Sequence, residues 1–420
     1  MIKKSVFTIL IFLLGFLPAS AQGYIENIGS CPLPNKGWHL EVSGNYAFIA
    51  CDSSGLQIAD ITDPEDPFIA AAYSTPSRAF DLCLAGGLVF IADFNSLQIL
   101  DISDPLSPDS VGGYQSDYVF SVHVSGNYAY IGRDYNVPAS EIIDISDPSS
   151  PQFLSGLTFW GGARQLYYSQ GYLYVLSSLS EPYSNYLRAV DVSDPLDPFV
   201  AGSVQIPGTI EIPGDIMVSG DYAYIANRSS GLQIVDISDP ENMEIIGSYD
   251  TPGDATGIFL NEHFAIIADY ITGIQIIGIV DPTDPFLADE GFTGHPAISA
   301  FGWYWDLIYV STTDSLVIFQ HLGDNIDTDP ISPRKFSVSQ NYPNPFNAAT
   351  VIRYSLPEPS DVKIEIFDTL GRKVETLIDE KQQAGYHQVI WKAEDRSSGI
   401  YLYRIEAGDN VETRKMLLLR

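Results

Sequence analysis

Short apolar runs separated by turn residues recur along the first three quarters of the chain. Residues 214–250 contain four in succession: "DIMVSG", "YAYIAN", "LQIVDI" and "MEIIGSY". Runs of this length that are rich in β-branched and aromatic residues predict strands. The second and third runs are apolar at consecutive positions, which is typical of strands covered on both faces. We therefore expect a four-stranded unit with strands A to D in chain order.

The unit occurs seven times, and the end of strand C marks it most clearly. "LQIVDISDP" (232–240) has close copies such as "LQILDISDP" (97–105). Its first aspartate position is occupied by Asp60, Asp101, Asp144, Asp191, Asp236, Gly278 and Gln320, at steps of 41 to 47 residues. Repeats of this length with strand patterns indicate the blades of a β-propeller.

The seventh copy ends after strand C, near Phe319, and has no strand D of its own. Near the N-terminus, "YIENIGSCPLP" (24–34) resembles the strand D segment "MEIIGSYDTP" (243–252). We therefore expect the first strand to complete the last blade and close the ring, which removes exposed sheet edges. Residues 22–322 are thus predicted to form a seven-bladed β-propeller.

Two further regions flank this ring. Residues 1–21 carry Lys3 and Lys4, an apolar run and the small residues "ASA", so they predict a signal peptide cleaved after Ala21. A membrane anchor is the alternative, and no later segment is apolar and long enough to span a membrane. Residues 323–335 have a linker composition. Residues 336–420 alternate apolar and polar positions between turn signals, which predicts a small β-sandwich.

Charge is distributed unevenly between these regions. The formal net charge is −32; residues 22–333 contain 6 basic and 41 acidic residues, whereas residues 334–420 contain 13 and 12. Nucleic acid is therefore not an expected partner of the propeller, since phosphates would be repelled. The acidity fits either a solvated extracellular surface or attraction for cations and basic partners. Cys31, Cys51 and Cys83 leave at least one thiol without an intrachain partner, and a Cys51–Cys83 disulfide is an open alternative.

Two resemblances rest on these residues. "GLQIVDISDP" and "GNYAYIA" resemble the LVIVD repeats of bacterial β-propellers over residues 24–322, which implies a secreted or surface protein but little about activity. The C-terminal region resembles the type A sorting domain of the type IX secretion system in "QNYPNPFN" (340–347), "LGRKV" (370–374), "SGIYLYRIEAG" (398–408) and "RKMLLLR" (414–420).

The sorting-domain resemblance implies a Gram-negative bacterium of the Bacteroidota type. It also implies that residues 336–420 engage the type IX secretion machinery and a sortase-like peptidase. That peptidase would remove the domain and leave the protein released or attached to surface lipopolysaccharide. An accessory fibronectin-like domain that stays attached is the alternative.

The repeated aspartates are interpreted as architecture. Their side chains can accept hydrogen bonds from nearby backbone amides and so cap the turn after strand C. The proline holds the residue before it in an extended conformation. Calcium ligation is the alternative, although the spacing fits neither an EF-hand nor a nonapeptide calcium repeat. No other cofactor is expected.

In a propeller the A–B and C–D turns lie on one face, here called the repeat face. The B–C loops and the D–A connections lie on the other, here called the variable face, because its segments differ between copies: 133–140, 158–164, 178–186, 205–215 and 293–297. Loops that vary on a repeated scaffold often carry function. Candidate ligand-binding side chains there are Tyr135, Phe159, Trp160, Tyr183 and Tyr186; packing of the loops against one another is the alternative.

Strand A is expected to line the central channel. Aligning the copies places His39, Asp81, His123 and Asp215 there, a set that suits either a metal or acid–base site or a polar lining filled with water. No GxSxG, HExxH or phosphate-loop motif occurs.

Three functions therefore remain open. The first is a non-enzymatic binding or adhesion protein, secreted or on the cell surface, with a protein or glycan ligand. The second is a secreted polysaccharide hydrolase or lyase with its site on the variable face, and the third is a structural spacer of a surface layer.

Overall fold

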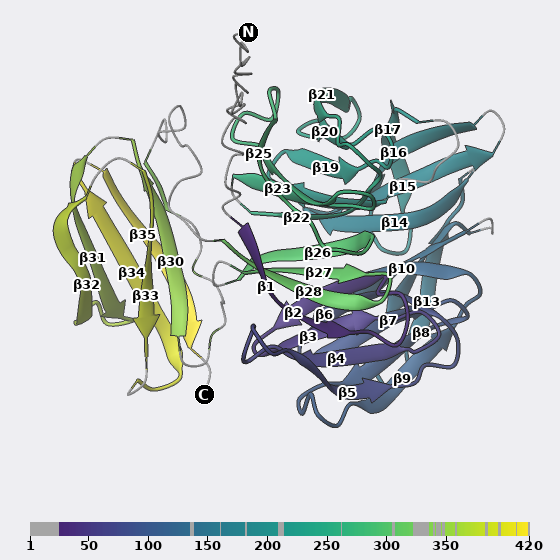
Figure 1. Cartoon of the computed structure of the whole chain (residues 1–420), viewed down its shortest axis with the longest axis horizontal. Helices are drawn as coiled ribbons and strands as arrows, with labels where there is room; N and C mark the ends of the chain where they lie inside the picture. Colours follow the sequence, from purple (N-terminus) through teal and green to yellow (C-terminus); the bar gives the residue numbers. More distant parts are fainter. Residues whose placement is uncertain are drawn as a thin grey trace, which may run out of the picture. The chain divides into compact units, whose positions relative to one another are not determined.

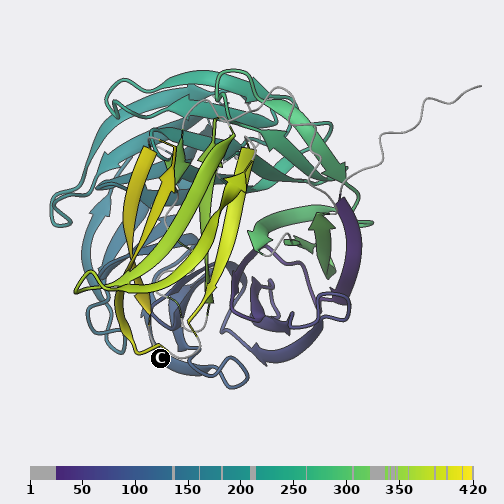
Figure 2. The same ribbon diagram turned by 90° about the vertical axis from the view of Figure 1, so that its left-hand side faces the viewer.

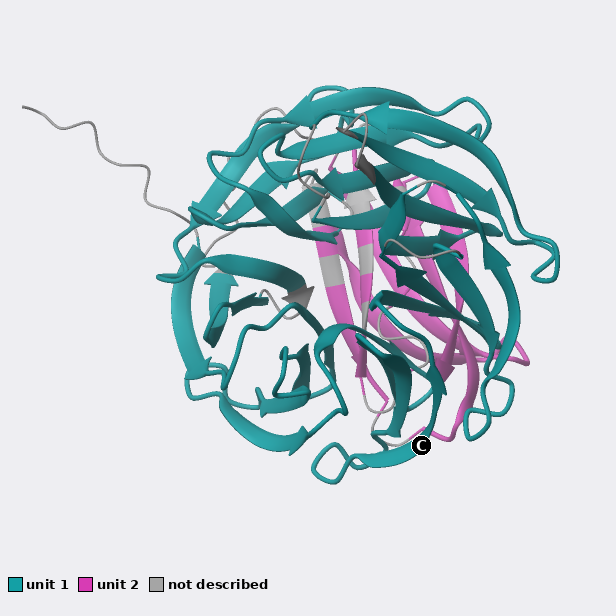
Figure 3. Cartoon of the chain, turned by 90° about the vertical axis from the view of Figure 1, so that its right-hand side faces the viewer, with its two compact units in different colours: residues 1–326 teal, residues 327–420 magenta. Residues whose placement is uncertain are grey.

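The computed structural model describes residues 25–134, 138–159, 161–180, 183–208, 214–261, 263–304, 307–321, 336–338, 341, 346, 349–357, 359–382, 385–393, 396–408 and 410–418. The chain divides into two compact units, residues 1–326 and 327–420 (Figure 3). The described residues form strands and no helix, and so include no helix that could span a membrane. The predicted signal peptide with Ala21 and the predicted linker lie outside the described residues.

The first unit consists of seven four-stranded antiparallel sheets arranged around a common axis (Figure 1). Blades 1 to 3 are β2 (His39–Ser43), β3 (Tyr46–Ala50), β4 (Leu56–Asp60), β5 (Phe68–Tyr73); β6 (Ala79–Ala85), β7 (Leu88–Asp93), β8 (Ser96–Asp101), β9 (Asp109–Gln115); and β10 (Val119–Ser125), β11 (Tyr128–Arg133), β12 (Ser140–Asp144), β13 (Gln152–Leu157). Blades 4 to 6 are β14 (Gly162–Ser169), β15 (Tyr172–Ser180), β16 (Tyr183–Asp191), β17 (Phe199–Ile206); β18 (Asp215–Ser219), β19 (Tyr222–Ala226), β20 (Leu232–Asp236), β21 (Glu244–Tyr249); and β22 (Ala255–Leu260), β23 (Phe264–Asp269), β24 (Gly273–Gly278), β25 (Phe286–Gly291).

Blade 7 is closed by the N-terminal strand, as the sequence predicts. Its sheet contains β26 (Ala297–Tyr304), β27 (Leu307–Thr312), β28 (Ser315–His321) and β1 (Ile25–Pro32). β1 pairs antiparallel with β28, and Cys31 lies opposite Leu316. The two ends of the propeller are therefore joined by backbone hydrogen bonds within one sheet.

The core lies between neighbouring blades. Phe48 and Ile58 of blade 1 pack against Leu82 and Ile91 of blade 2, and all four side chains are buried. Strands B and C are buried on both faces because each sheet is covered by two others, which explains their continuous apolar runs. Cys31, Cys51 and Cys83 lie in these cores as buried free thiols, so the Cys51–Cys83 disulfide is absent from the structure.

The repeated aspartates cap the C–D turns, as predicted. In blade 5, Asp236 Oδ1 accepts a hydrogen bond from Ser238 N at 2.9 Å, and Asp239 Oδ1 accepts one from Glu241 N at 3.1 Å. The first of these contacts recurs at Asp60, Asp101, Asp144 and Asp191, and the second at Asp63, Asp104, Asp147, Asp194 and Asp281.

The proline of the same turn contacts the preceding blade. The backbone of Gly247 in β21 lies so close to the carbonyl oxygen of Pro282, in the next blade's turn, that a Cβ at that position would overlap it. The same approach occurs at Gly29–Pro64, Gly112–Pro148 and Gly202–Pro240. In blade 3 a serine replaces the glycine, and Ser155 Oγ donates to the carbonyl oxygen of Pro195 at 2.6 Å. The turn therefore also joins successive blades.

The second unit is a β-sandwich (Figure 2). One sheet contains β29 (Ser337–Val338), β30 (Ala349–Leu356) and β33 (Gly385–Lys392); the other contains β32 (Lys373–Gln382), β31 (Ser360–Asp368), β34 (Gly399–Ala407) and β35 (Asn410–Leu418). The core between the sheets is built around Trp391 and Tyr403, both fully buried. Its strands coincide with the alternating runs of the sequence.

Candidate functional site

The inner strands surround a cavity of about 230 Å³ along the channel, and His39, Asp81, His123 and Asp215 all line it. His39 Nδ1 lies 3.5 Å from Asp81 Oδ1. His123 instead packs against Tyr167 of the next blade, with ring centroids 4.7 Å apart. Among the side chains that the structure describes, no three His, Cys, Asp or Glu groups are placed to hold a metal ion.

The channel carboxylates connect neighbouring blades. Asp81 accepts hydrogen bonds from Leu82 N and, in the next blade, from Val122 N, both at 2.9 Å. Asp215 accepts one from Ile216 N at 2.8 Å and one from Ile258 N of the following blade at 3.3 Å. Glu41 accepts one from Leu84 N at 3.2 Å. These contacts support the interpretation of the set as a structural, polar channel lining.

Burial shifts the titration of these groups toward their neutral forms. It raises the pKa of Glu41 to about 8, that of Asp81 to about 7 and that of Asp215 to about 6. Burial also lowers the pKa of His39, against the attraction of Asp215, and lowers the pKa of His123 to about 4. Near neutral pH both imidazoles are therefore uncharged. The channel carries much less charge than it would if all of its acidic and histidine side chains were ionised.

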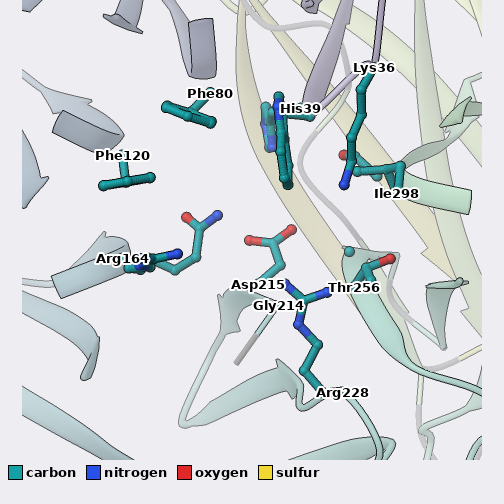
Figure 4. A pocket seen from close by; sticks show the side chains of 14 residues that line it. Lys36, His39, Phe80, Phe120, Arg164, Gly214, Asp215, Arg228, Thr256 and Ile298 are labelled. Carbon is teal, nitrogen blue, oxygen red and sulfur yellow. The ribbon is translucent and has the colours of Figure 1, made fainter. Parts of the chain in front are cut away.

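A second cavity, of about 100 Å³, opens where the channel meets the variable face. In five blades the pairing of strands A and B contains a β-bulge, and the bulged residue lines this cavity: Phe80, Phe120, Arg164, Thr256 and Ile298. A bulge turns one side chain out of the alternation of its strand. We call this cavity the mouth pocket; its other walls include Lys36, Trp38, Gln165, Asp215, Arg228 and Ser299 (Figure 4).

Aromatic rings at the mouth position cations. Lys36 Nζ lies 3.5 Å from the ring centroid of Trp38, and the Arg164 guanidinium lies 4.4 Å from that of Phe120. Phe80 stacks on Phe120 with centroids 4.7 Å apart. These cation–π contacts hold positive charge over the rings.

Acidic groups on neighbouring loops hold part of this arrangement. Asp52 accepts hydrogen bonds from Trp38 Nε1 at 2.9 Å and from the Arg78 guanidinium at 2.9 and 2.6 Å. Arg78 keeps the pKa of Asp52 at about 2. Asp134 pairs with Arg164. Trp38 and Arg164 are thus fixed from outside the pocket.

The five aromatic side chains predicted to bind ligand lie elsewhere or outside the described residues. Phe159 and Tyr186 flank the guanidinium of Arg188, which lies 5.1 Å from each ring centroid, and neither lines the mouth pocket. Tyr183 begins β16, and its side chain is not described. Tyr135 and Trp160 lie outside the described residues.

The sequence does contain a signal for the mouth pocket. Aligned on the A–B turn, the position one residue before His39, Asp81 and their equivalents carries Trp38, Phe80, Phe120, Gln165, Gly214, Thr256 and Ser299. All seven of these residues line the mouth pocket. Four of these seven residues, Gln165, Gly214, Thr256 and Ser299, are not large apolar residues, whereas alternation along strand A predicts an apolar residue at this position.

The repeats and the C-terminal unit each match a known family. Residues 36–75, 77–116, 118–157, 161–206, 213–251 and 252–290 match the LVIVD repeat, so more than half of the chain is covered and the protein belongs to the LVIVD repeat family. The blade closed by β1 has no match of its own. Residues 340–419 match the secretion system C-terminal sorting domain. The chain is therefore a type IX-sorted β-propeller protein, exported to the cell surface or secreted.

Solved structures show the same fold at low sequence identity. The WD40 β-propeller domain of Doa1 shares 10% identity at a TM-score of 0.54, covering 71% of this chain and 97% of that one. The computationally designed Ika8 protein also shares 10% at 0.52, covering 70% and 99%. PorZ, a surface component of the type IX secretion system of Porphyromonas gingivalis, shares 13% and covers 93% and 60%, but its TM-score of 0.49 is too low to support an argument. A search of curated proteins found no match.

Proposed function

We propose that this exported propeller is a non-catalytic binding protein that takes an extracellular ligand at the mouth pocket. The observation that carries the proposal is the set of bulges in strand A. Five blades use the same backbone irregularity to direct five side chains of four kinds into one cavity. A regular scaffold that presents different residues at equivalent positions is typical of a binding surface.

The hydrogen bonds of the channel carboxyl groups favour binding over polysaccharide hydrolysis or lysis. Glycosidases need two carboxyl groups that flank the scissile bond. Asp81 and Asp215 have both of their carboxyl oxygens in hydrogen bonds with backbone amides, so these groups are held as structural acceptors. A structural spacer, in turn, has no need for different side chains at equivalent bulges.

The proposal is tested with the mature chain, residues 22–420, screened against arrays of glycans and extracellular proteins. For a ligand found in this way, Phe120→Ala should weaken binding about tenfold, because it removes the ring under Arg164 and opens the pocket wall. The matched control is Phe199→Ala in strand D, since Phe199 is 57% exposed and does not line the mouth pocket. A ligand whose affinity changes with Phe199 and not with Phe120 would show that the site lies elsewhere.

A further inference from the structure

All six basic residues between positions 22 and 333 lie on the variable face. Lys36 and Arg78 lie in D–A connections, Arg228 in a B–C loop, and Arg133 and Arg164 at the strand ends on this side. The sixth, Arg188, is in β16, and its guanidinium lies over the ring of Phe159, which belongs to a D–A connection. The repeat face carries the capping aspartates and no lysine or arginine among its described residues. The basic side chains of this acidic unit therefore all lie on one face.

Three of these cations form ion pairs with acidic residues that the structure describes, which lie on neighbouring loops or, for Glu141, on β12. Arg78 pairs with Asp52, and the other two ion pairs are Arg133–Glu141 and Arg164–Asp134. Within the described part of the chain Lys36 has no ion pair, and its ammonium group lies over the ring of Trp38. Lys36 is therefore held at the mouth without a carboxylate of its own.

Lys36 and Arg228 extend into the mouth pocket from blades 1 and 5, with their nitrogen atoms directed toward the same space (Figure 4). The backbone of Arg228 is fixed in a left-handed conformation, φ 49°, by paired hydrogen bonds with Ala255 at 2.9 and 3.0 Å. Two cations directed into one cavity repel each other. Burial together with the charges of Arg228 and Arg78, opposed by Asp52, lowers the pKa of Lys36 to about 8.

Ser299 lines the same pocket and carries an unsatisfied hydroxyl. Ser299 Oγ is buried and, in the described structure, has no hydrogen-bond partner, while Ser299 as a residue is only 2% exposed. A buried hydroxyl without a partner is costly, and a ligand oxygen is one group that can satisfy it. Asp215, the acidic group in the wall, is engaged by backbone amides of Ile216 and Ile258.

From these observations we propose that the mouth pocket binds a single small anionic group, a carboxylate, sulfate or phosphate, between Lys36 and Arg228, with Ser299 as a hydrogen-bond donor. This inference rests on the proposed binding function and adds the chemistry of its ligand. The volume of about 100 Å³ corresponds to roughly three water molecules, so the pocket accommodates an end group or substituent and not a polymer chain.

The test is titration of the mature chain at low ionic strength, followed by calorimetry and thermal shift, with sodium sulfate, inorganic phosphate and glucuronate as separate arms and chloride as the reference. We expect saturable binding of at least one of the three, weakened about tenfold or more by Lys36→Met and by Arg228→Gln. Arg188→Gln is the matched control, because Arg188 is a cation of the same face that does not line the pocket. It should bind as the wild type does.

The pH dependence separates charge recognition from a structural effect. Affinity should fall as the pH rises through about 8, where Lys36 loses its proton, and Lys36→Arg should restore binding and remove this dependence. The groups facing Lys36 are Arg228, Arg78 and Asp52, together with the rings of Trp38 and Tyr270. Absence of binding in all three arms, or equal binding by Lys36→Met, overturns the inference. If a ligand from the array screen still depends on Phe120, the proposed function survives that failure.

Discussion

At the scale of single residues, carboxyl groups from three blades have the same backbone role in the channel. Glu41, Asp81 and Asp215 each accept a hydrogen bond from an amide of the next blade. Because these acceptors are buried, folding keeps them closer to neutrality than an exposed acid would be. The polar lining therefore holds neighbouring blades together and also makes stability depend on pH.

This dependence has a defined sign and window. The folded state keeps a proton on Glu41 up to a pKa of about 8, whereas the ordinary value is 4.5, so folding binds protons and the free energy of unfolding should fall as pH rises. The buried histidines act in the opposite direction only below their ordinary value of 6.5. Between pH 6.5 and 8 the carboxyl groups thus dominate.

Over that pH window, the free energy of unfolding of Glu41→Gln should decrease by about 1 to 2 kcal/mol less than that of the wild type. The reason is that the amide keeps an acceptor for Leu84 N and cannot ionise. The measurement is urea denaturation at a series of pH values. Glu241→Gln, at an exposed position of a C–D turn, is the control and should leave the slope unchanged. A Glu41→Gln slope equal to that of the wild type would show that Glu41 is not the group responsible.

At the scale of elements, the strands and turns of the propeller could be predicted because their causes are local and repeated. Strands B and C have apolar runs since they are covered on both faces, and the aspartates cap the turn within two residues of themselves. Even the closing strand was recognisable from its likeness to strand D. Each of these features is encoded in one short stretch of sequence.

The mouth pocket could not be predicted in the same way. A bulge depends on how strand A pairs with strand B, so alternation within "AFDLCLA" does not show that Phe80 leaves the pattern. Lys36 and Arg228, which are far apart in the sequence, line the same pocket only because the blades close into a ring. Phe159 and Tyr186, two of the predicted aromatic residues, do not line this pocket, because loop variability identifies a face and not a position on it.

The contact between strand D and the next turn yields a prediction about stability. Gly247→Ala should lower the free energy of unfolding by about 1 to 3 kcal/mol, because the added Cβ meets the carbonyl oxygen of Pro282 and forces blades 5 and 6 apart. Ser248→Ala, at the exposed neighbouring position, is the matched control. Chemical denaturation measures both, and equal stability of the two variants would remove the proposed role of this contact in blade docking.

At the scale of the whole molecule, the two units differ in charge as well as in architecture. Residues 22–333 contain 6 basic and 41 acidic residues, whereas residues 334–420 are nearly balanced, with 13 and 12. The propeller directs its few cations to the variable face, so within the propeller an anionic ligand finds basic side chains on that face. The second unit has its own hydrophobic core around Trp391. Binding and sorting are thus assigned to units that can be separated by experiment.

That separation gives the last prediction. In a bacterium with a type IX system, a reporter carrying residues 1–21 at its N-terminus and residues 327–420 at its C-terminus should reach the cell surface or the medium. The protein lacking residues 327–420 should stay in the periplasm, with its anion binding unchanged, because the mouth pocket lies wholly in the first unit. Trp391→Ala in the reporter is the control: loss of a fully buried ring should unfold the sandwich and abolish export. Fractionation and immunodetection measure the outcome, and a periplasmic reporter with residues 327–420 intact would contradict an autonomous sorting unit.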